Sequence, residues 1–364
     1  MKTFVSTFAA LLAMIVLSQA SAVADDFYWV AEGNQSANQN GGAKAVAPAP
    51  TDCTACDPSC YDDTGCDCCD TCGCLGCDEC PPYGVVGIFG FDSFKGISDW
   101  FAYSNYGAVV GLNAAMPLLG LRDRGFGWQL GMTYGVYDWD GGSLLKPATS
   151  QQQIFVTTGF YRKAGVDQRL SFGIVYDWMI NDNWGFFGTN PTLGQWRGQV
   201  EWAFGDGCNS IGVYGAIRDL YAREAFYTQE QYYYSVITRP VSQYNLFWHH
   251  KFASGADSWV WVGGVQTDRL NGDGSLGDWI IGASVQAPLS DRLALYGNAQ
   301  YMHPSGTAGR TSAIEAGWNV GAGIVWYFGG YAVSHRINGK CWLPYLPVAN
   351  NSTFLVDQQV TLRD

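Results

Sequence analysis

Ten of the twelve cysteines lie within residues 53–80, the densest group of reactive side chains in the sequence. Several form Cys-x-x-Cys pairs, such as Cys53/Cys56 and Cys69/Cys72. Thiols at this spacing bind soft metal ions as thiolates or pair as disulfides. The disulfide candidates are Cys53, Cys56, Cys60, Cys66, Cys68, Cys69, Cys72, Cys74, Cys77, Cys80, Cys208 and Cys341.

The N-terminus favours disulfides. Lys2 is followed by an apolar run over 4–17 and by small residues at Ala20, Ala22 and Ala24, the pattern of a cleaved signal peptide spanning 1–24. An exported chain enters an oxidising compartment, where free thiols are converted to disulfides. The sequence therefore predicts disulfides, no bound metal and no cofactor.

Polar side chains that recur singly within apolar segments form a second group. They fall on the face of the predicted strands opposite to the large apolar residues, where they would line a lumen: Asp177, Arg197, Gln199, Glu201, Gln243, Asn245, Lys251, Asn298, Gln300, Glu315 and Asn319. Asp177 and Arg197 lie on neighbouring strands and are expected to pair near one rim. A charged constriction that selects solutes and an internal salt-bridge network that closes the lumen both fit this set.

The adjacent histidines His249 and His250 are the candidates for general acid–base chemistry. On a strand one of them faces the lumen and the other faces lipid. No motif places a serine or a carboxylate beside them, so they are interpreted as polar barrel residues, and no enzyme is predicted.

These residues are carried by segments of about ten residues that alternate in polarity. In one of them Trp128, Leu130 and Met132 share a face opposite Gln129 and Thr133, and a period of two indicates β-strands. Twelve strands are predicted: 84–91, 106–115, 127–137, 152–162, 169–179, 194–204, 210–219, 241–252, 258–267, 278–287, 292–302 and 315–328.

Three features favour a membrane barrel over a soluble sandwich. Strands near ten residues match the ~25–30 Å of hydrocarbon that a tilted strand must cross. One face is large and apolar, and with 14% charged residues the chain has too few charges for a water-facing sheet. The connections alternate between short and long, as periplasmic turns and external loops do. Tyr and Trp near strand ends predict two aromatic girdles: Tyr137, Trp139, Tyr176, Trp178, Trp196, Trp259, Trp261, Trp326 and Tyr327.

The predicted fold is all-β: a transmembrane antiparallel up-and-down barrel of about twelve strands at 83–330, after the signal peptide and a flexible acidic Cys-rich segment at 25–82. An even strand count puts both barrel ends in the periplasm. The tail at 331–364 is expected to pack on the barrel end or partly plug it. Topology then places Cys208 and Cys341 together, which suggests a disulfide between them.

The net charge of −12 leaves no basic face, which excludes a nucleic-acid partner. The stretches 151–157, 193–198, 342–350 and 354–356 resemble those of a family of uncharacterised outer-membrane barrel proteins of planctomycete-type bacteria. That resemblance covers about 83–360 and implies the barrel fold, without an activity.

The leading function hypothesis is a porin-like passive channel for small solutes in the bacterial outer membrane. The second is a structural or adhesive outer-membrane protein with a closed lumen, cross-linked through its Cys-rich segment, and the third is an outer-membrane hydrolase. The expected partners are outer-membrane lipid, small solutes and, through disulfides, other cell-envelope proteins.

Overall fold

The computed structural model describes residues 84–96, 104–121, 124–138, 150–164, 169–185, 188–205, 208–227, 233–252, 254–266, 277–304, 316–328, 332 and 342–363. All of them belong to one compact unit of the chain, Pro58–Asp364. Within these ranges no helix is long and apolar enough to cross a membrane.

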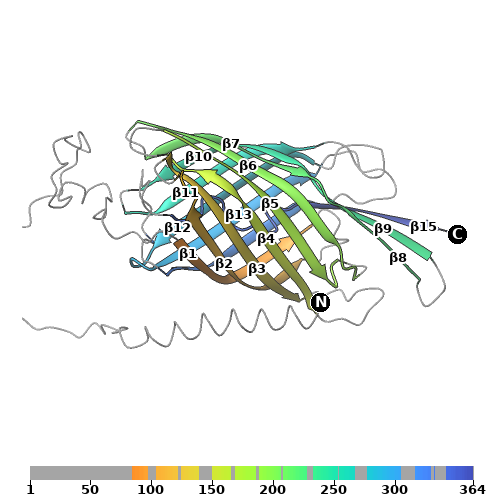
Figure 1. The fold of residues 1–364 in the computed structure, drawn as a ribbon. Helices are drawn as coiled ribbons and strands as arrows, with labels where there is room; N and C mark the ends of the chain where they lie inside the picture. Colours follow the sequence, from red (N-terminus) through yellow and green to blue (C-terminus); the bar gives the residue numbers. More distant parts are fainter. Residues whose placement is uncertain are drawn as a thin grey trace, which may run out of the picture. The chain divides into compact units, whose positions relative to one another are not determined.

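Twelve antiparallel strands form a closed barrel (Figure 1), which confirms the predicted fold class. They are β1 (Gly84–Lys95), β2 (Asn105–Pro117), β3 (Phe126–Asp138), β4 (Ser150–Arg162), β5 (Leu170–Asp182), β6 (Thr192–Phe204), β7 (Asn209–Arg218), β10 (Gln243–Lys251), β11 (Asp257–Val265), β12 (Gly277–Pro288), β13 (Leu293–Pro304) and β14 (Gly317–Tyr327). Each strand pairs with its chain neighbours, β7 pairs with β10, and β1 closes the ring on β14 with Val86 opposite Tyr327.

The period of two in the sequence sets the two faces of this sheet. In β3, Gln129 and Thr133 are buried in the interior, whereas Leu130 and Val136 are exposed on the outside. Closure pairs the backbone groups of the first and last strands and removes the sheet edges, so that only the side chains distinguish inside from outside.

The two ends of the barrel differ. At the end that we call the turn end, short connections join β4 to β5, β6 to β7, β10 to β11 and β12 to β13. Two of these turns contain a glycine at positive φ, Gly205 and Gly255, in a conformation that other residues adopt with strain. Longer connections lie at the opposite end, the loop end, as the sequence predicts.

A second sheet lies at the loop end. It consists of β8 (Ala222–Tyr227), β9 (Tyr233–Pro240) and β15 (Val356–Arg363), in the order β15-β9-β8. Figure 1 shows these strands extending past the barrel wall. None of these three strands is among the twelve predicted from the sequence. The end of the tail at 331–364 is not only packed on or in the barrel, because residues 356–363 form an edge strand of this second sheet.

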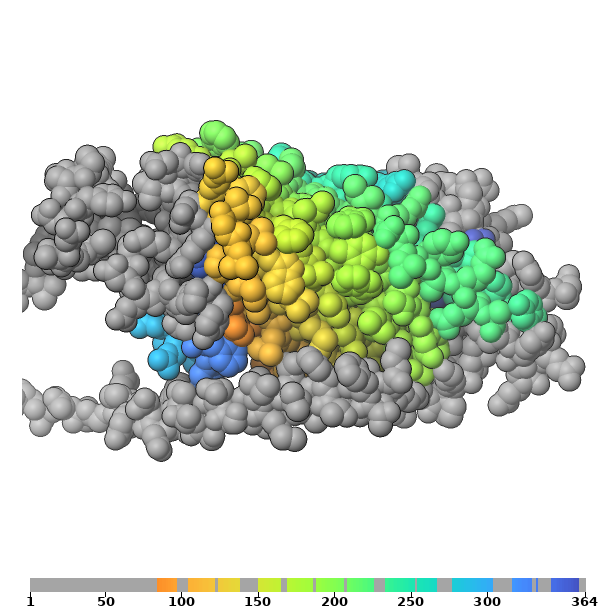
Figure 2. Space-filling view, viewed as in Figure 1, coloured from red at the N-terminus to blue at the C-terminus, as the bar shows by residue number. Residues whose placement is uncertain are grey.

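Large apolar side chains are exposed on the outer wall of the barrel. Figure 2 shows the part of this wall that β2 to β6 form. Exposed outward residues include Phe89, Ile174, Val213, Leu246 and Val320. Among the described side chains of the barrel strands, the outward-facing charged ones lie at strand ends: Lys95, Arg162, Asp182 and Asp278. A sheet designed to face water would carry charges along its whole length.

The predicted girdle residues are only partly correct. Tyr137, Trp259, Trp261 and Tyr327 face the lumen, and Trp139 lies outside the described residues. Tyr176, Trp178, Trp196 and Trp326 of the predicted set face outward. Further outward aromatic residues lie near the loop end, at Tyr106, Tyr244, Trp279, Tyr301 and Trp318, and near the turn end, at Trp128, Trp202 and Trp248.

Candidate functional site

Every predicted lumen-lining residue except Glu315, which lies outside the described residues, is on a barrel strand and in the inward register. Asp177, Arg197, Glu201, Gln243, Asn245, Gln300 and Asn319 are buried, and Gln199, Lys251 and Asn298 are partly buried. Their part in selecting a solute stays a prediction. The structure brings them into two groups, one around a charge pair at mid-barrel and one at the turn end.

The mid-barrel group is built on Arg197 and Asp177. The guanidinium Nε donates to Asp177 Oδ2 at 2.9 Å and Nη2 donates to Oδ1 at 3.0 Å. Both side chains are almost inaccessible to solvent, at 1% and 0%. Thr157 Oγ1 donates to Asp177 at 2.7 Å. The pair forms as expected from the sequence, but at the middle of the barrel wall and not at its rim.

The C-terminal segment crosses this interior. Arg197 Nη2 donates to the carbonyl of Pro347 at 2.7 Å, and the amide N–H of Ala349 donates to Thr157 Oγ1 at 2.9 Å. We call residues 342–355 the lumen segment. Of the two placements considered for the tail, on the barrel end or inside it, the second is observed, and the segment runs from the turn end to β15 at the loop end.

Side-chain amides of the wall hold the backbone of the lumen segment. Gln129 accepts from the N–H groups of Tyr345 and Leu346 and donates to the Leu346 carbonyl at 2.8 Å. Asn113 donates to the same carbonyl. Gln195 and Gln243 both donate to the carbonyl of Thr353, and Gln300 donates to that of Ser352. Buried backbone groups need such partners, so these wall residues substitute for the missing strand neighbours of the segment.

Within the segment, Asn350 closes a tight turn. Its Oδ1 accepts from the N–H groups of Ser352 and Thr353, the pattern of an Asx turn. The next residue, Asn351, donates to Asp92 Oδ2 at 2.9 Å and to Gln153 Oε1 at 3.0 Å. The turn therefore fixes the segment to β1 and β4 at once.

Apolar contacts complete the fit. Phe155, Met179, Leu193 and Trp184 pack with Val348, Ala349, Phe354 and Val356 in one buried cluster. Glycines in the wall make room for this approach. A Cβ at Gly131 would lie 2.4 Å from Val348 Cγ2, and one at Gly173 would lie 2.5 Å from Leu346 Cδ1. Larger residues at these positions would displace the segment.

A second charged group lies at the turn end. The two ring nitrogens of His249 lie 2.5 Å from Glu201 Oε1 and 2.5 Å from Asp257 Oδ1. The ring stacks on Trp259 at 4.2 Å between centroids, and Tyr345 Oη of the lumen segment donates to Glu201 Oε2 at 3.2 Å. An imidazolium donates from both nitrogens, so one positive ring satisfies two carboxylates. Because both nitrogens are engaged, neither is left for a nucleophile.

This cluster was not predicted from the sequence. His249 is the histidine predicted to face the lumen, but no partner was predicted for its ring, and Asp257 fell between the predicted strands 241–252 and 258–267. The alternation of polar and apolar residues already placed Glu201 and His249 on the inward faces of their strands. What was missing is the register between β6, β7, β10 and β11, which brings Glu201, His249 and Asp257 to one height.

Two lysines lie beside this cluster. Lys251 ends β10, and Lys163 follows β4 with its Nζ 5.7 Å from the centre of the Tyr161 ring. Burial, and then the repulsion of Lys251, lower the pKa of Lys163 to about 7. This end of the lumen thus combines two carboxylates, one imidazole and two amines.

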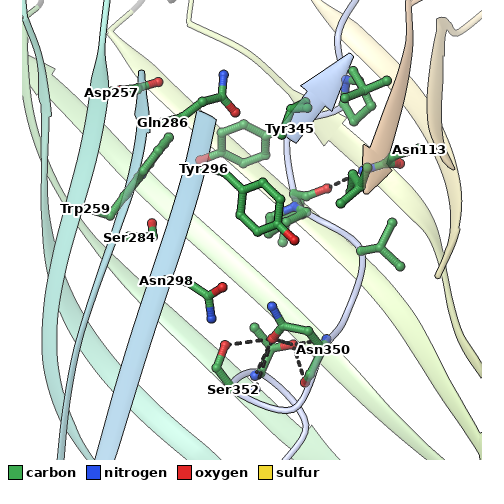
Figure 3. A pocket seen from close by; sticks show the side chains of 18 of the residues that line it. Asn113, Asp257, Trp259, Ser284, Gln286, Tyr296, Asn298, Tyr345, Asn350 and Ser352 are labelled. Carbon is green, nitrogen blue, oxygen red and sulfur yellow. Dashed lines mark hydrogen bonds between the residues drawn. The ribbon is translucent and has the colours of Figure 1, made fainter. Parts of the chain in front are cut away.

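A cavity of about 500 Å³ remains beside the lumen segment. Figure 3 shows it between Tyr345, Asn350 and Ser352 of the segment and residues of the facing strands β11 to β13. The labelled wall residues are Asn113 of β2 and, on β11 to β13, Asp257, Trp259, Ser284, Gln286, Tyr296 and Asn298. The cavity lining also includes wall residues that bind the segment, such as Asn113 and Arg197, so the cavity adjoins the bound segment.

The cysteine predictions fall mostly outside the described residues, as do the signal peptide, the segment 25–82 and Cys341. Cys208 is described and lies buried in the β6–β7 turn, where its carbonyl accepts from the Lys251 N–H at 2.8 Å. Over the ranges described, no group of three or more His, Cys, Asp or Glu residues is arranged to hold a metal ion.

The model of one protein family, described as a family of unknown function (DUF6666), matches residues 85–356. Among curated proteins no match was found.

Solved structures that are similar to this chain include those of three bacterial proteins. An outer-membrane channel from Pseudomonas putida F1 has a TM-score of 0.44 and 9% identity, covering 69% of this chain and 98% of its own. The β domain of the Bordetella autotransporter BrkA has a TM-score of 0.39 and 13% identity, covering 68% and 99%. Outer-membrane phospholipase A from Escherichia coli has a TM-score of 0.35 and 9% identity, covering 68% and 97%. At these values no activity transfers to this chain.

Proposed function

We propose that this chain, which belongs to the family of unknown function (DUF6666), is a bacterial outer-membrane channel for small solutes whose lumen is restricted by its own C-terminal segment. The observation that carries the proposal is a closed barrel with an apolar outside and a polar inside, in which the lumen segment leaves a cavity beside it.

The outer surface supports the membrane location. Large apolar side chains such as Phe89, Ile174 and Val213 are each more than half exposed. In water this exposed apolar area would drive aggregation, whereas in hydrocarbon it is favourable. A purified chain that stays monodisperse without detergent would contradict this part of the proposal.

The interior supports the restriction. The lumen segment is fixed by hydrogen bonds and by a buried apolar cluster, so it is part of the folded barrel. The 500 Å³ cavity beside it offers room for a small molecule but not for a wide aqueous pore.

Single-channel recording in planar bilayers tests the proposal. The intact protein is expected to give small discrete current steps. Asn351→Ala removes the hydrogen bonds of the segment to Asp92 and Gln153 and should give larger or more frequent steps. Arg223→Ala on β8, an exposed residue away from the lumen, is the control. The absence of current steps with all three proteins would rule out a channel.

The second candidate is a structural or adhesive barrel with a closed lumen, cross-linked to the envelope through the Cys-rich segment. It is favoured by the wall amides on β3, β6, β10 and β13 that hold the segment in place. This candidate predicts silent bilayers together with envelope adducts that disappear on reduction in a non-reducing gel.

A further inference from the structure

Some polar residues of the lumen wall hydrogen-bond the lumen segment, whereas others do not. On β2 to β6, Asn113, Gln129, Thr157 and Arg197 all bind the lumen segment. On β12 and β13, Gln300 also binds the segment, but Ser284 and Tyr296 line the cavity, and their hydroxyls have no hydrogen-bond partner among the described residues. These hydroxyls face a space that the segment leaves open.

Two amines, those of Lys163 and Lys251, line the turn end of this space, and the carboxylates and the guanidinium around it are held by other protein groups. Asp257 and Glu201 hold the His249 ring, Arg197 is paired with Asp177, and Asp92 accepts from Asn319 and Asn351. A charged solute would compete with these pairs and lose hydration, a cost of several kcal/mol in a buried site. Apart from these two amines, the polar groups that the lining offers to a solute are neutral hydrogen-bonding groups.

Aromatic rings supply the remaining surface. Trp259, Tyr296 and Tyr345 lie around the cavity (Figure 3). Rings with amides and hydroxyls between them suit molecules that have both an apolar face and several hydroxyl groups. The volume of about 500 Å³ lies within the range of small-ligand pockets.

We infer that this cavity is a binding site for a neutral, polyhydroxylated solute of mono- or disaccharide size. The inference rests on the proposed function, since it names the solute class of the same lumen. Ser284 and Tyr296 would hydrogen-bond the solute hydroxyls, and Trp259 and Tyr345 would contact its apolar faces.

Calorimetric titration of the full-length protein in a detergent without a sugar headgroup tests this. Neutral mono- and disaccharides are the probes, with gluconate and glucosamine as charged comparisons. Saturable binding of a neutral sugar is expected, with at least tenfold weaker binding of both charged analogues.

Two variants locate the site. Ser284→Leu places bulk in the cavity and should weaken binding at least tenfold, and Tyr296→Phe, which removes one hydroxyl, should weaken it several-fold. Ala283→Leu changes the neighbouring outward residue by the same side chain and should leave the affinity unaltered. Unaltered melting of all variants shows that they fold.

The inference is overturned if no neutral sugar binds saturably, if the charged analogues bind equally well, or if Ser284→Leu binds like Ala283→Leu. Because binding is measured without a current, its failure is distinct from that of the channel proposal. A silent bilayer with intact sugar binding would remove transport and keep the site.

Discussion

At the scale of single residues, the buried Asp177–Arg197 pair has the largest expected effect on stability. Asp177→Asn leaves a guanidinium buried without its counter-charge, and removing one partner of such a pair costs about 3–5 kcal/mol. The urea midpoint followed by tryptophan fluorescence should fall accordingly. Asp278→Asn, at a residue whose side chain is 52% exposed, is the matched control. Equal midpoints for the two variants would contradict the assignment.

Lys163 gives the fold a dependence on pH. Its pKa is lowered to about 7 in the folded protein from 10.5. Between these values the unfolded chain binds more protons than the folded one, so this residue makes the free energy of unfolding rise with pH from about 7 upward. Urea midpoints at pH 7 and pH 9.5 should diverge less for Lys163→Met than for the unaltered protein. An identical pH slope in both proteins would exclude this role.

At the scale of elements, the outward face of a strand determines whether it can lie in lipid. Val213 is 55% exposed near the middle of β7. Val213→Arg places a charge in hydrocarbon, at a cost of about 2–4 kcal/mol near the midplane. Stability in lipid vesicles should fall by that amount, whereas Leu289→Arg, in the β12–β13 turn, should have little effect. Similar losses at both positions would argue against a lipid-facing belt.

The strands could be predicted because a period of two is a local property. Gln129 and Leu130 reveal the two faces of β3 without knowledge of any other strand. The girdle assignment failed for Tyr137 and Tyr327 because nearness to a strand end was used instead of the parity of each residue. Within their strands, Tyr137 and Tyr327 alternate in step with the residues that face the lumen.

What could not be predicted depends on contacts between distant parts of the chain. The lumen segment has no periodicity of its own, and its path is set by residues such as Gln129 and Arg197, more than a hundred positions earlier. β15 forms because the segment delivers it to β9. The partners of His249 likewise require the register between strands.

At the scale of the whole molecule, the two ends of the barrel lie on opposite sides of the proposed membrane. With the turn end in the periplasm, β15 lies on the external side. A short epitope tag after Asp364 should be labelled by antibody on intact cells. A tag inserted after Ser290, in the β12–β13 turn, should be labelled only after permeabilisation. Labelling of the C-terminal tag only after permeabilisation would contradict this path of the segment.

The passage of the C-terminal segment through the ring also constrains assembly. If β1 pairs with β14 before the lumen segment is in place, the segment must later be threaded through the closed barrel, with its C-terminal end first. A short, unfolded tail can do this, whereas a folded protein fused behind Asp364 is wider than the lumen. With such a fusion, the barrel can contain the lumen segment only if it closes around that segment. The yield of folded barrel from the fusion therefore shows whether the segment is in place before β1 pairs with β14.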